Sequence, residues 1–345
     1  MRQNVDLTGY TTFGCVSRAE YFCEVTTLDA LKAAIDEAKV LGLTIHCLGG
    51  GANTIAMPWV KGLVIKMAIP GFDVRREADG VTVRLGAGED MDSVIARLVD
   101  QGLGGLENLS AIPGTLGGAI VQNIGAYGGE IGPFVESVQI YDSESGEVRD
   151  LTPEALHFDY RHSVFKEPEA KGWIILGATL RLGDPDRWRP TLSYKAVEEE
   201  IRQLGLDALS LTPRVMRDLI TNIRWRKLPD PKKVGNAGSF FTNPKITTVH
   251  WRELIALQPT LAWYELDESY RKIAAASLID LAGLKGLEHE HVAVHKTHAL
   301  ILVNRGGATG EDVLALAQAI KDRVYTLFGV HLEREPVVLG EAPQA

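Results

Sequence analysis

Cysteines and long apolar stretches are scarce in this sequence, and each shortage excludes a class of protein. The 345 residues include three cysteines, Cys15, Cys23 and Cys47, and no two of them form a Cys-x-x-Cys pair. An odd number without such a pair favours reduced thiols, as in the cytoplasm. No run of about 18 apolar residues occurs, so no membrane span is predicted. The N-terminus lacks the apolar core of a secretory signal, and we expect a cytoplasmic protein.

Positive charge is also in short supply. The chain has 36 Lys and Arg against 45 Asp and Glu, a formal net charge of -9 at pH 7. This balance argues against a general nucleic-acid binder, although an anionic small molecule needs only a few local cations. Hydrophobic residues make up 45% of the chain and charged residues 23%, which suits a globular protein of about two or three domains.

Glycine is plentiful, and it is concentrated in the stretch GLENLSAIPGTLGGAIVQNIGAYGG (105–129). This stretch holds seven glycines, and Glu107 is its only charged residue. Because each interior glycine costs a helix about 1 kcal/mol relative to alanine, we do not expect a regular helix here. Regularly spaced apolar residues argue against a disordered linker. Bare amide groups in such a loop suit phosphate, and a set of tight turns between buried strands is the alternative.

A second glycine loop follows a predicted strand at 44–48. It reads Gly49-Gly50-Gly51-Ala52-Asn53-Thr54 and precedes another predicted strand at 62–69. It is not a P-loop, because no Gly-Lys-Ser/Thr follows, and it is not the Rossmann fingerprint, which leads into a helix. Taken alone, this loop is a weak signal for a second phosphate cradle.

The spacing of apolar residues predicts the regular elements of an α/β arrangement. A helix capped by Thr26 or Thr27 and ended by Gly42 presents one apolar face, formed by Leu31, Ala34, Ile35 and Ala38. Further helices are predicted at 91–101, from Pro153, from Tyr194, from Pro213, at 273–283 and from about Gly310. Strands are predicted at 81–85, twice within 137–151, and at 173–182, 298–304 and 331–340.

Polar residues at four places could carry chemistry. They are Arg161 beside two aromatic residues, Ser239 between a glycine and two phenylalanines, Glu335 in the alternating terminal segment, and Arg224 with Lys227 before a proline-broken segment. Ser239 could point into a shielded pocket. Each also has an ordinary alternative: a surface ion pair, a turn serine, a solvated carboxylate and a charged helix end, in the same order.

The histidine-rich segment 289–298 invites a metal hypothesis. The HExxH motif fails, because Ala293 occupies the position that requires the second histidine. The segment around 291–295 has the pattern of a strand, and no cysteine partners lie near it. We therefore predict no metal site.

Five segments occur in a familiar order and together resemble the UDP-N-acetylenolpyruvoylglucosamine reductase family. They are LGGGANT (48–54), GLENLSAIPGTLGGAIVQNIGAYG (105–128), DYRHSVFK (159–166), KLPDPKKVGNAGSFFTNP (227–244) and LEREP (332–336). The resemblance covers nearly the whole chain. Tyr194 in a segment of its own is similar to the type I branch, which carries a tyrosine-bearing loop over the substrate.

The resemblance implies an α+β fold in three parts. Residues 1–69 are expected to form the first part of a vanillyl-alcohol-oxidase/PCMH-type two-part FAD-binding fold, with the terminal strand at about 330–345 returning to it. Residues 70–228 are expected to form the second part, and 229–329 a C-terminal α/β substrate-binding domain.

The resemblance also implies the reaction. Bound FAD is expected to accept electrons from NADPH as co-substrate and to reduce the enolpyruvyl ether of UDP-N-acetylglucosamine to UDP-N-acetylmuramate, in bacterial peptidoglycan precursor synthesis. We expect a monomer with this sugar nucleotide as its partner, and neither nucleic acid nor membrane. A sugar or alcohol oxidase on the same fold and a non-catalytic flavin-binding sensor are the alternatives.

The family's functional residues carry over onto matching positions here. Arg161 is implied as the cation on the substrate carboxylate, Ser239 as the proton donor and Glu335 as an acid near the developing enolate. FAD binding is implied for Gly49, Gly50, Gly51, Ala52, Asn53, Thr54, Pro113, Gly114, Gly117, Gly118, Asn123, Gly125 and Ala126. Substrate binding is implied for Tyr127, Tyr194, Arg224, Lys227 and Asn243.

Three positions depart from the family pattern. Ala52 stands where a serine is common, which removes one hydroxyl contact to FAD. Val337 stands where some relatives have arginine, and His298 where some have glutamine. These departures affect the detail of the ligand contacts rather than the reaction.

Overall fold

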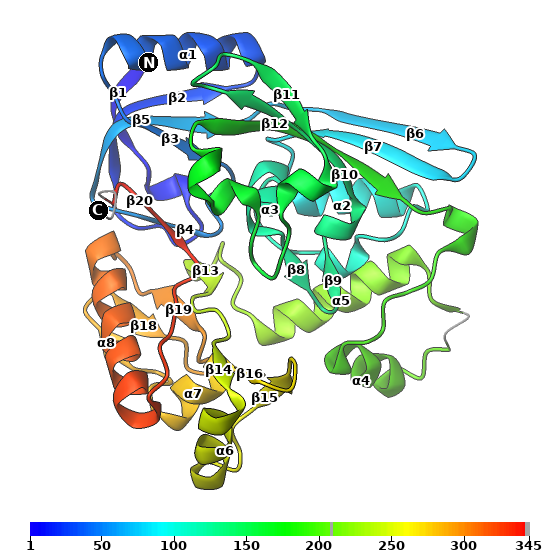
Figure 1. Ribbon diagram of the computed structural model, residues 1–345, viewed down its shortest axis with the longest axis vertical. Helices are drawn as coiled ribbons and strands as arrows, with labels where there is room; N and C mark the ends of the chain where they lie inside the picture. Colours follow the sequence, from blue (N-terminus) through cyan, green and yellow to red (C-terminus); the bar gives the residue numbers. More distant parts are fainter. Residues whose placement is uncertain (208–209, 342–345) are drawn as a thin grey trace. The chain divides into compact units, whose positions relative to one another are not determined.

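A computed structural model describes residues 1–207 and 210–341, and this part of the chain divides into two compact units (Figure 1). Unit 1 comprises Met1–Gln3, Tyr21–Gly50 and Gly62–Lys227. Unit 2 comprises Asn4–Glu20, Gly51–Lys61 and the chain from Leu228 onward. The last four residues of the predicted terminal strand at 330–345 lie outside the described residues.

The regular elements come in runs of strands separated by helices. The helices are α1 (Leu28–Val40), α2 (Met91–Asp100), α3 (Leu116–Gln122), α4 (Lys195–Gln203), α5 (Pro213–Lys227), α6 (Thr248–Leu257), α7 (Ala275–Leu281) and α8 (Gly310–Phe328). The strands of the first half are β1 (Arg2–Asp6), β2 (Arg18–Val25), β3 (Ile45–Leu48), β4 (Thr54–Ala56), β5 (Trp59–Met67), β6 (Phe72–Glu77), β7 (Gly80–Gly86), β8 (Gly125–Ala126), β9 (Gly129–Glu130), β10 (Val135–Asp142), β11 (Val148–Leu151) and β12 (Trp173–Leu182). The later strands are β13 (Asn236–Ser239), β14 (Lys245–Thr247), β15 (Trp263–Glu265), β16 (Tyr270–Ile273), β17 (Glu288–His289), β18 (Val292–Val294), β19 (Ile301–Asn304) and β20 (Val337–Leu339).

Unit 1 is built on two sheets that share a core with three helices. One sheet has the antiparallel order β11-β10-β12-β7-β6, and in the other β3 pairs with β5 in parallel (Figure 1). The helix predicted after residue 27 is α1, and Thr27 Oγ1 accepts a hydrogen bond from Ala30 N at 3.1 Å. All four residues of its predicted apolar face are buried. Buried residues of α1, α2, α3, β7, β10 and β12 form one hydrophobic cluster.

The glycine stretch contains a helix, and the expectation of no regular helix there was wrong. Helix α3 spans Leu116–Gln122 and includes both Gly117 and Gly118. Gly117 N donates to the carbonyl oxygen of Ala87, directly after β7, at 3.0 Å, which joins the start of the helix to the end of that strand. The helix is only seven residues long, and buried apolar residues such as Leu116 and Ile120 offset the cost of two glycines.

Unit 2 contains a second core between short sheets and the helices α6, α7 and α8. Strands β13-β19-β18-β17 form one sheet, β14-β16-β15 form another, and both are antiparallel. Helix α8, predicted from about Gly310, begins with a capping box: Thr309 Oγ1 accepts from Asp312 N, and Thr309 N donates to the Asp312 carboxylate. Strand β18 confirms the strand predicted within 291–295. The helix predicted from Pro153 in unit 1 is a single 3-10 turn, Pro153–Leu156.

The C-terminal segment pairs with the strand that follows the second glycine loop. Strand β20 runs parallel to β4, with Val337 opposite Thr54. The strand predicted at 331–340 is regular only over β20, because the residues before it make one isolated bridge, between Arg334 and Phe241. Pairing of these two strands places the second half of the glycine loop in unit 2.

The two units divide the chain differently from the three parts predicted from the sequence. Unit 2 contains Asn4–Glu20 and Gly51–Lys61, which the prediction placed in the first FAD-binding part. Sequence patterns are local, whereas these segments join unit 2 through β20 and through contacts described below. The assignment of three parts to separate functions stays a prediction.

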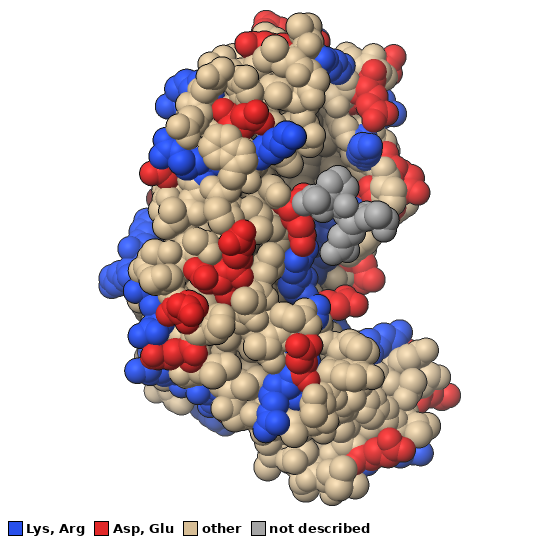
Figure 2. Space-filling model, turned by 90° about the vertical axis from the view of Figure 1, so that its left-hand side faces the viewer, with Lys and Arg blue, Asp and Glu red and all other residues tan. Residues whose placement is uncertain are grey.

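Charged side chains are intermingled on the face drawn in Figure 2, with basic, acidic and uncharged residues interspersed. This mixture accords with the modest excess of acids in the whole sequence. The absence of a nucleic-acid partner stays a prediction. None of the helices in the described ranges is long and apolar enough to cross a membrane.

Candidate active site

The two glycine loops meet inside unit 1. A Cβ on Gly50 would lie 2.6 Å from Gly114 Cα, and a Cβ on Gly49 would lie 2.7 Å from Thr115 Oγ1. Real Cβ atoms do not approach this closely, so both positions need glycine for the segments to touch. The loop at 49–54 is further held by Lys66 of β5, whose Nζ donates to Gly49 O at 2.5 Å.

Thr115 is the residue in this contact that lacks a protein partner. Its hydroxyl oxygen is buried and has no hydrogen-bond partner among the described residues. It is the N-cap residue of α3, yet its side chain makes no capping bond. A Cβ on Gly118 would meet no atom within 4 Å. Because buried hydroxyl groups normally find a partner, these residues fit a ligand with its own polar atoms, such as a pyrophosphate.

The second half of the glycine loop at 49–54 is held within unit 2. Gly51 has a φ of +65°, and a Cβ there would lie 2.1 Å from the Tyr10 carbonyl oxygen. Asn53 contacts the C-terminal segment twice: Asn53 Nδ2 donates to Glu335 O at 3.2 Å, and Val337 N donates to Asn53 O at 3.0 Å. The loop and the predicted catalytic Glu335 are therefore adjacent.

Strands β8 and β9 form a tight hairpin that presents Tyr127. Tyr127 and Gly128, the two residues between the strands, have φ values of 50° and 84°. The Tyr127 ring packs edge-on against that of Tyr194, with centroids 5.4 Å apart. Burial raises the pKa of Tyr127, and the cation of Arg224 opposes that shift. Three predicted substrate residues thus come together in unit 1.

Arg224 lies on α5 with its Nε buried and without a hydrogen-bond partner among the described residues. Burial lowers the pKa of its guanidinium, and the nearby Tyr127 and Asp92 oppose the shift. A buried guanidinium Nε without a hydrogen-bond partner is costly, so the half-buried Arg224 is suited to an anionic ligand that supplies one. Lys227, three residues later at the end of α5, is exposed.

Glu107 and Asn108 support this region, and the sequence analysis assigned neither a role there. Asn108 Nδ2 donates to Tyr127 O at 2.7 Å and to Thr191 O at 3.0 Å, three residues before Tyr194. Glu107 accepts from Trp188 Nε1 at 2.9 Å. The isolated acid in an otherwise uncharged stretch was the available sequence signal.

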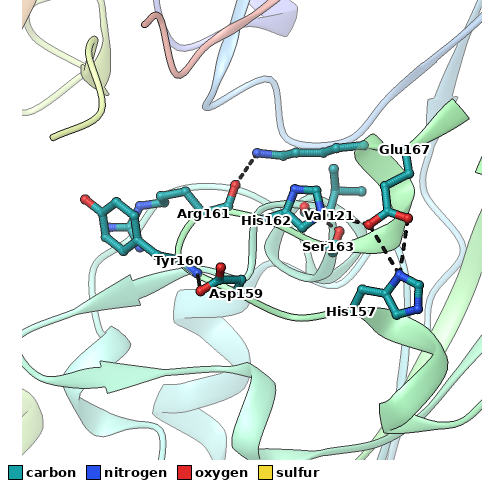
Figure 3. Close-up of polar contacts among 9 residues, drawn as sticks. Val121, His157, Asp159, Tyr160, Arg161, His162, Ser163 and Glu167 are labelled. Carbon is teal, nitrogen blue, oxygen red and sulfur yellow. Dashed lines mark hydrogen bonds and ion pairs between the residues drawn. The ribbon is translucent and has the colours of Figure 1, made fainter. Parts of the chain in front are cut away.

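Arg161 lies in a turn whose backbone is strained. Its φ is 55°, in the left-handed region, which costs a residue other than glycine on the order of 1–3 kcal/mol. The turn is closed by the bridge between Asp159 and His162, and Figure 3 shows Tyr160 and Arg161 at its tip. Arg161 Nη2 donates to Gly125 O at 2.7 Å, and the guanidinium lies 5.0 Å from the Tyr160 ring centroid. The cation is thereby tied to β8.

Asn123, predicted to bind FAD, uses its side chain within the protein. Its Oδ1 accepts from Gly132 N at 3.0 Å, and its Nδ2 donates to Asp159 O at 3.0 Å. Its φ of 41° ends helix α3 in the left-handed conformation. The structure thus gives Asn123 a local structural task, and its contact with FAD stays a prediction.

Ser239 and Glu335 lie on adjoining backbone segments of unit 2. Glu335 N donates to Phe240 O at 2.9 Å, next to Ser239 at the end of β13. The Ser239 side chain is exposed, so the expectation of a shielded pocket around it was wrong. Gly238, with a φ of +71°, and the register shift between Asn236 and Ser239 turn the strand end outward.

Asn243, predicted to bind substrate, caps a helix. Its Oδ1 accepts from Ala275 N, the first residue of α7, at 3.0 Å. Within the described ranges, no group of three or more His, Cys, Asp or Glu side chains is placed to hold a metal ion. The prediction that no metal is involved stays a prediction.

Comparison with known proteins decides the family. Residues 19–152 match a model described as an FAD binding domain, and residues 230–339 match the C-terminal domain of UDP-N-acetylenolpyruvoylglucosamine reductase. A reductase of that name from Cupriavidus pinatubonensis is 41% identical over 96% of both chains. The chain belongs to the UDP-N-acetylenolpyruvoylglucosamine reductase family. It is an oxidoreductase that contains FAD, as the sequence predicted.

Further relatives of this reductase family agree. The enzyme of the same name from Burkholderia multivorans is 41% identical over 96% of this chain and 95% of its own. The crystal structure of the reductase from Thermus caldophilus superimposes with a TM-score of 0.68 at 26% identity, covering 97% of this chain and 98% of that one. The predicted fold class, an FAD-binding fold followed by the reductase C-terminal domain, is confirmed.

Proposed function

We propose that this chain uses NADPH to reduce the enolpyruvyl ether of UDP-N-acetylglucosamine to UDP-N-acetylmuramate, a step of peptidoglycan precursor synthesis. The chain belongs to the reductase family, and one structural observation supports the proposal most directly. The glycine loops at 49–50 and 114–115 meet around the unpartnered buried hydroxyl of Thr115. This arrangement supports the binding of a diphosphate-containing cofactor such as FAD.

Five of the residues predicted to hold FAD are glycines near this contact, and Thr115, which was not predicted to bind FAD, lies among them. Gly49, Gly50, Gly114, Gly117 and Gly118 keep side chains away from the contact, and Thr115 and backbone amides offer polar groups. When bound, FAD would supply the redox chemistry, hydride transfer from NADPH to the methylene carbon of the enol ether, which side chains cannot provide. The protein's part is to bind, orient and protonate the substrate.

Arg161 is proposed to bind the substrate carboxylate. Hydride addition at the methylene carbon leaves negative charge on the neighbouring carbon, shared with the carboxylate as an enolate. A guanidinium can make paired hydrogen bonds to a carboxylate and stabilise that charge as it develops. The bond from Arg161 Nη2 to Gly125 O supports this role, because it fixes one edge of the guanidinium.

Ser239 is proposed to give its proton to the carbon that bears the carboxylate, with water restoring the hydroxyl. A serine hydroxyl is a weak acid, so it suits a strongly basic enolate. Glu335 is proposed to share a proton with the same developing charge. The hydrogen bond between Glu335 N and Phe240 O supports a joint role, since it joins their two backbone segments.

The remaining polar residues are proposed to bind the sugar nucleotide. Tyr127, Tyr194 and Arg224 supply two aromatic rings and a buried cation for its uridine and diphosphate, and Lys227 adds a second cation. The contact of Asn243 with substrate is the least supported of these, because its side chain oxygen caps α7. We further propose that the chain acts as a monomer in the cytoplasm, and the three free cysteines support the cytoplasmic location.

The flavin spectrum of the purified protein tests this function. An absorption band at about 450 nm should bleach when NADPH is added without oxygen and should return on adding the enolpyruvyl sugar nucleotide. Recovery with dioxygen alone, and none with the sugar nucleotide, would point to an oxidase. A protein that binds flavin but turns over neither compound would be a sensor, and one that stays colourless with added FAD would refute the proposal.

A further inference from the structure

Lys166 joins the Arg161 turn to helix α3. Its ammonium Nζ donates to the Arg161 carbonyl oxygen at 2.6 Å and to Gln122 Oε1, at the last residue of α3, at 2.5 Å. The Arg161 guanidinium in turn donates to Gly125 O. Lys166 and Arg161 therefore connect the turn to both ends of the segment Gln122–Gly125.

Further hydrogen bonds hold the residues on either side of the turn. They leave little room for the backbone of Arg161 to move. Ser163 is fully buried and its Oγ donates to Val121 O at 2.7 Å. Glu167 lies 2.9 Å from His162 Nε2 and 3.2 Å from His157 Nδ1, as Figure 3 shows. These contacts fix the two ends of the turn, whereas Lys166 acts on the carbonyl group of Arg161 itself.

We propose that Lys166 is a positioning residue that sets the orientation of Arg161 for the reduction step. The inference rests on the proposed function, in which Arg161 binds the substrate carboxylate. A left-handed backbone is a high-energy state for arginine, so it persists only where surrounding contacts hold it. Removing the ammonium takes a charged donor from the Arg161 carbonyl oxygen and frees the turn to relax. A shift of about 1 Å in a positioned group can cost a reaction about 100-fold.

The two half-reactions separate this role from general damage. In Lys166→Met, flavin reduction by NADPH should stay within about 2-fold of the unaltered protein, because Arg161 has no proposed part in it. Reoxidation by the enolpyruvyl sugar nucleotide should slow by about 10- to 100-fold. Lys166→Arg keeps charged donors and should recover most of the rate. Lys171→Met, at an exposed lysine in the same segment, should change neither half-reaction.

A double-mutant cycle with Arg161→Ala decides the matter. If Lys166 acts through Arg161, adding Lys166→Met to Arg161→Ala should slow reoxidation by less than about 2-fold further. Full additivity, or equal losses in both half-reactions, would overturn the proposal. If Lys166→Met fails to retain flavin, Lys166→Gln replaces it in the same cycle. An Arg161→Ala protein with unimpaired reoxidation would refute the proposed role of Arg161 instead, so the two failures are distinguishable.

Discussion

Ser239 is an exposed residue at the end of β13, and no hydrogen bond of the described chain is known to depend on its hydroxyl. Ser239→Ala should therefore leave thermal stability nearly unchanged. If the hydroxyl protonates the substrate carbon, the variant should reoxidise with the enolpyruvyl sugar nucleotide about 100- to 10,000-fold more slowly. Flavin reduction by NADPH should keep its rate, and stopped-flow absorbance measures both steps.

Ser269→Ala, at another exposed serine of unit 2, serves as the matched control for that substitution. It should leave both steps unchanged. An equal loss in the two half-reactions of Ser239→Ala would show damage to the fold rather than loss of a proton donor. Unchanged reoxidation would remove Ser239 from the mechanism.

Glu107 is a buried carboxyl group whose pKa depends on the hydrogen bonds that it accepts. It is 2% exposed, and it accepts hydrogen bonds from Gly105 N at 2.5 Å and Trp188 Nε1 at 2.9 Å. Burial raises the pKa of Glu107 above its ordinary 4.5, and these bonds oppose the rise. Because the pKa of Glu107 is higher in the folded protein than in the unfolded chain, protonation of Glu107 favours folding. Its contribution to stability is fully present below pH 4.5 and is lost as the pH rises through the pKa of the folded protein.

Trp188→Phe should destabilise the protein in a pH-dependent manner. Without the indole donor, the buried Glu107 carboxylate has one hydrogen bond fewer. This lowers the free energy of unfolding by about 1–3 kcal/mol at neutral pH. At about pH 4 the carboxyl group of the folded protein is protonated, so the cost should be smaller. Thermal unfolding at both pH values measures this difference. Trp225→Phe, at an exposed tryptophan of α5, should show no such trend, and a cost independent of pH would contradict the argument.

At the scale of elements, local chemistry made some helices predictable and others not. The 3.6-residue spacing of apolar side chains in α1 and the reciprocal cap of α8 are properties of a single helix, so the sequence was sufficient for both. Helix α3 was missed because it is held by contacts with segments distant in sequence: Gly117 N donates to Ala87 O at 3.0 Å, and Leu116 and Ile120 are buried in the core of unit 1. The family motifs identified Arg161 and Ser239, yet neither the left-handed turn nor the exposed strand end follows from them, because both depend on contacts between segments.

Asn243 is the residue whose predicted and observed roles diverge at the start of an element. Because its Oδ1 accepts from the first amide of α7, Asn243→Ala should cost about 1 kcal/mol of stability, the usual value of a lost N-terminal cap. Asn243→Asp keeps the acceptor oxygen and should restore the midpoint of thermal unfolding. If the KM for the sugar nucleotide is unchanged in both Asn243→Ala and Asn243→Asp, then Asn243 has only its structural role. Unaltered stability in Asn243→Ala would show that the cap contributes little.

At the scale of the molecule, the two units are assembled from interleaved parts of the chain. Phe13, Cys15 and Ile55 have no exposed surface and belong to the hydrophobic core of unit 2, although they lie far before Leu228. Asn304 Nδ2 donates to the carbonyl oxygens of Phe13 at 3.0 Å and of Gly14 at 2.9 Å. Sequence patterns cannot reveal such partners, because hydrophobic periodicity reports which residues are buried and not what covers them.

This interleaving predicts that the C-terminal part of the chain does not fold alone. A fragment of residues 228–345 lacks β4 and the segments that supply Phe13 and Ile55, and removal of a single core phenylalanine side chain already costs about 3–5 kcal/mol. Since small domains are stable by only about 5–15 kcal/mol, the fragment should show no cooperative thermal transition by circular dichroism. Co-expression with residues 1–227 restores the missing segments and should restore the transition. A fragment that unfolds cooperatively by itself would contradict the division into units, because its core would then be complete without the N-terminal segments.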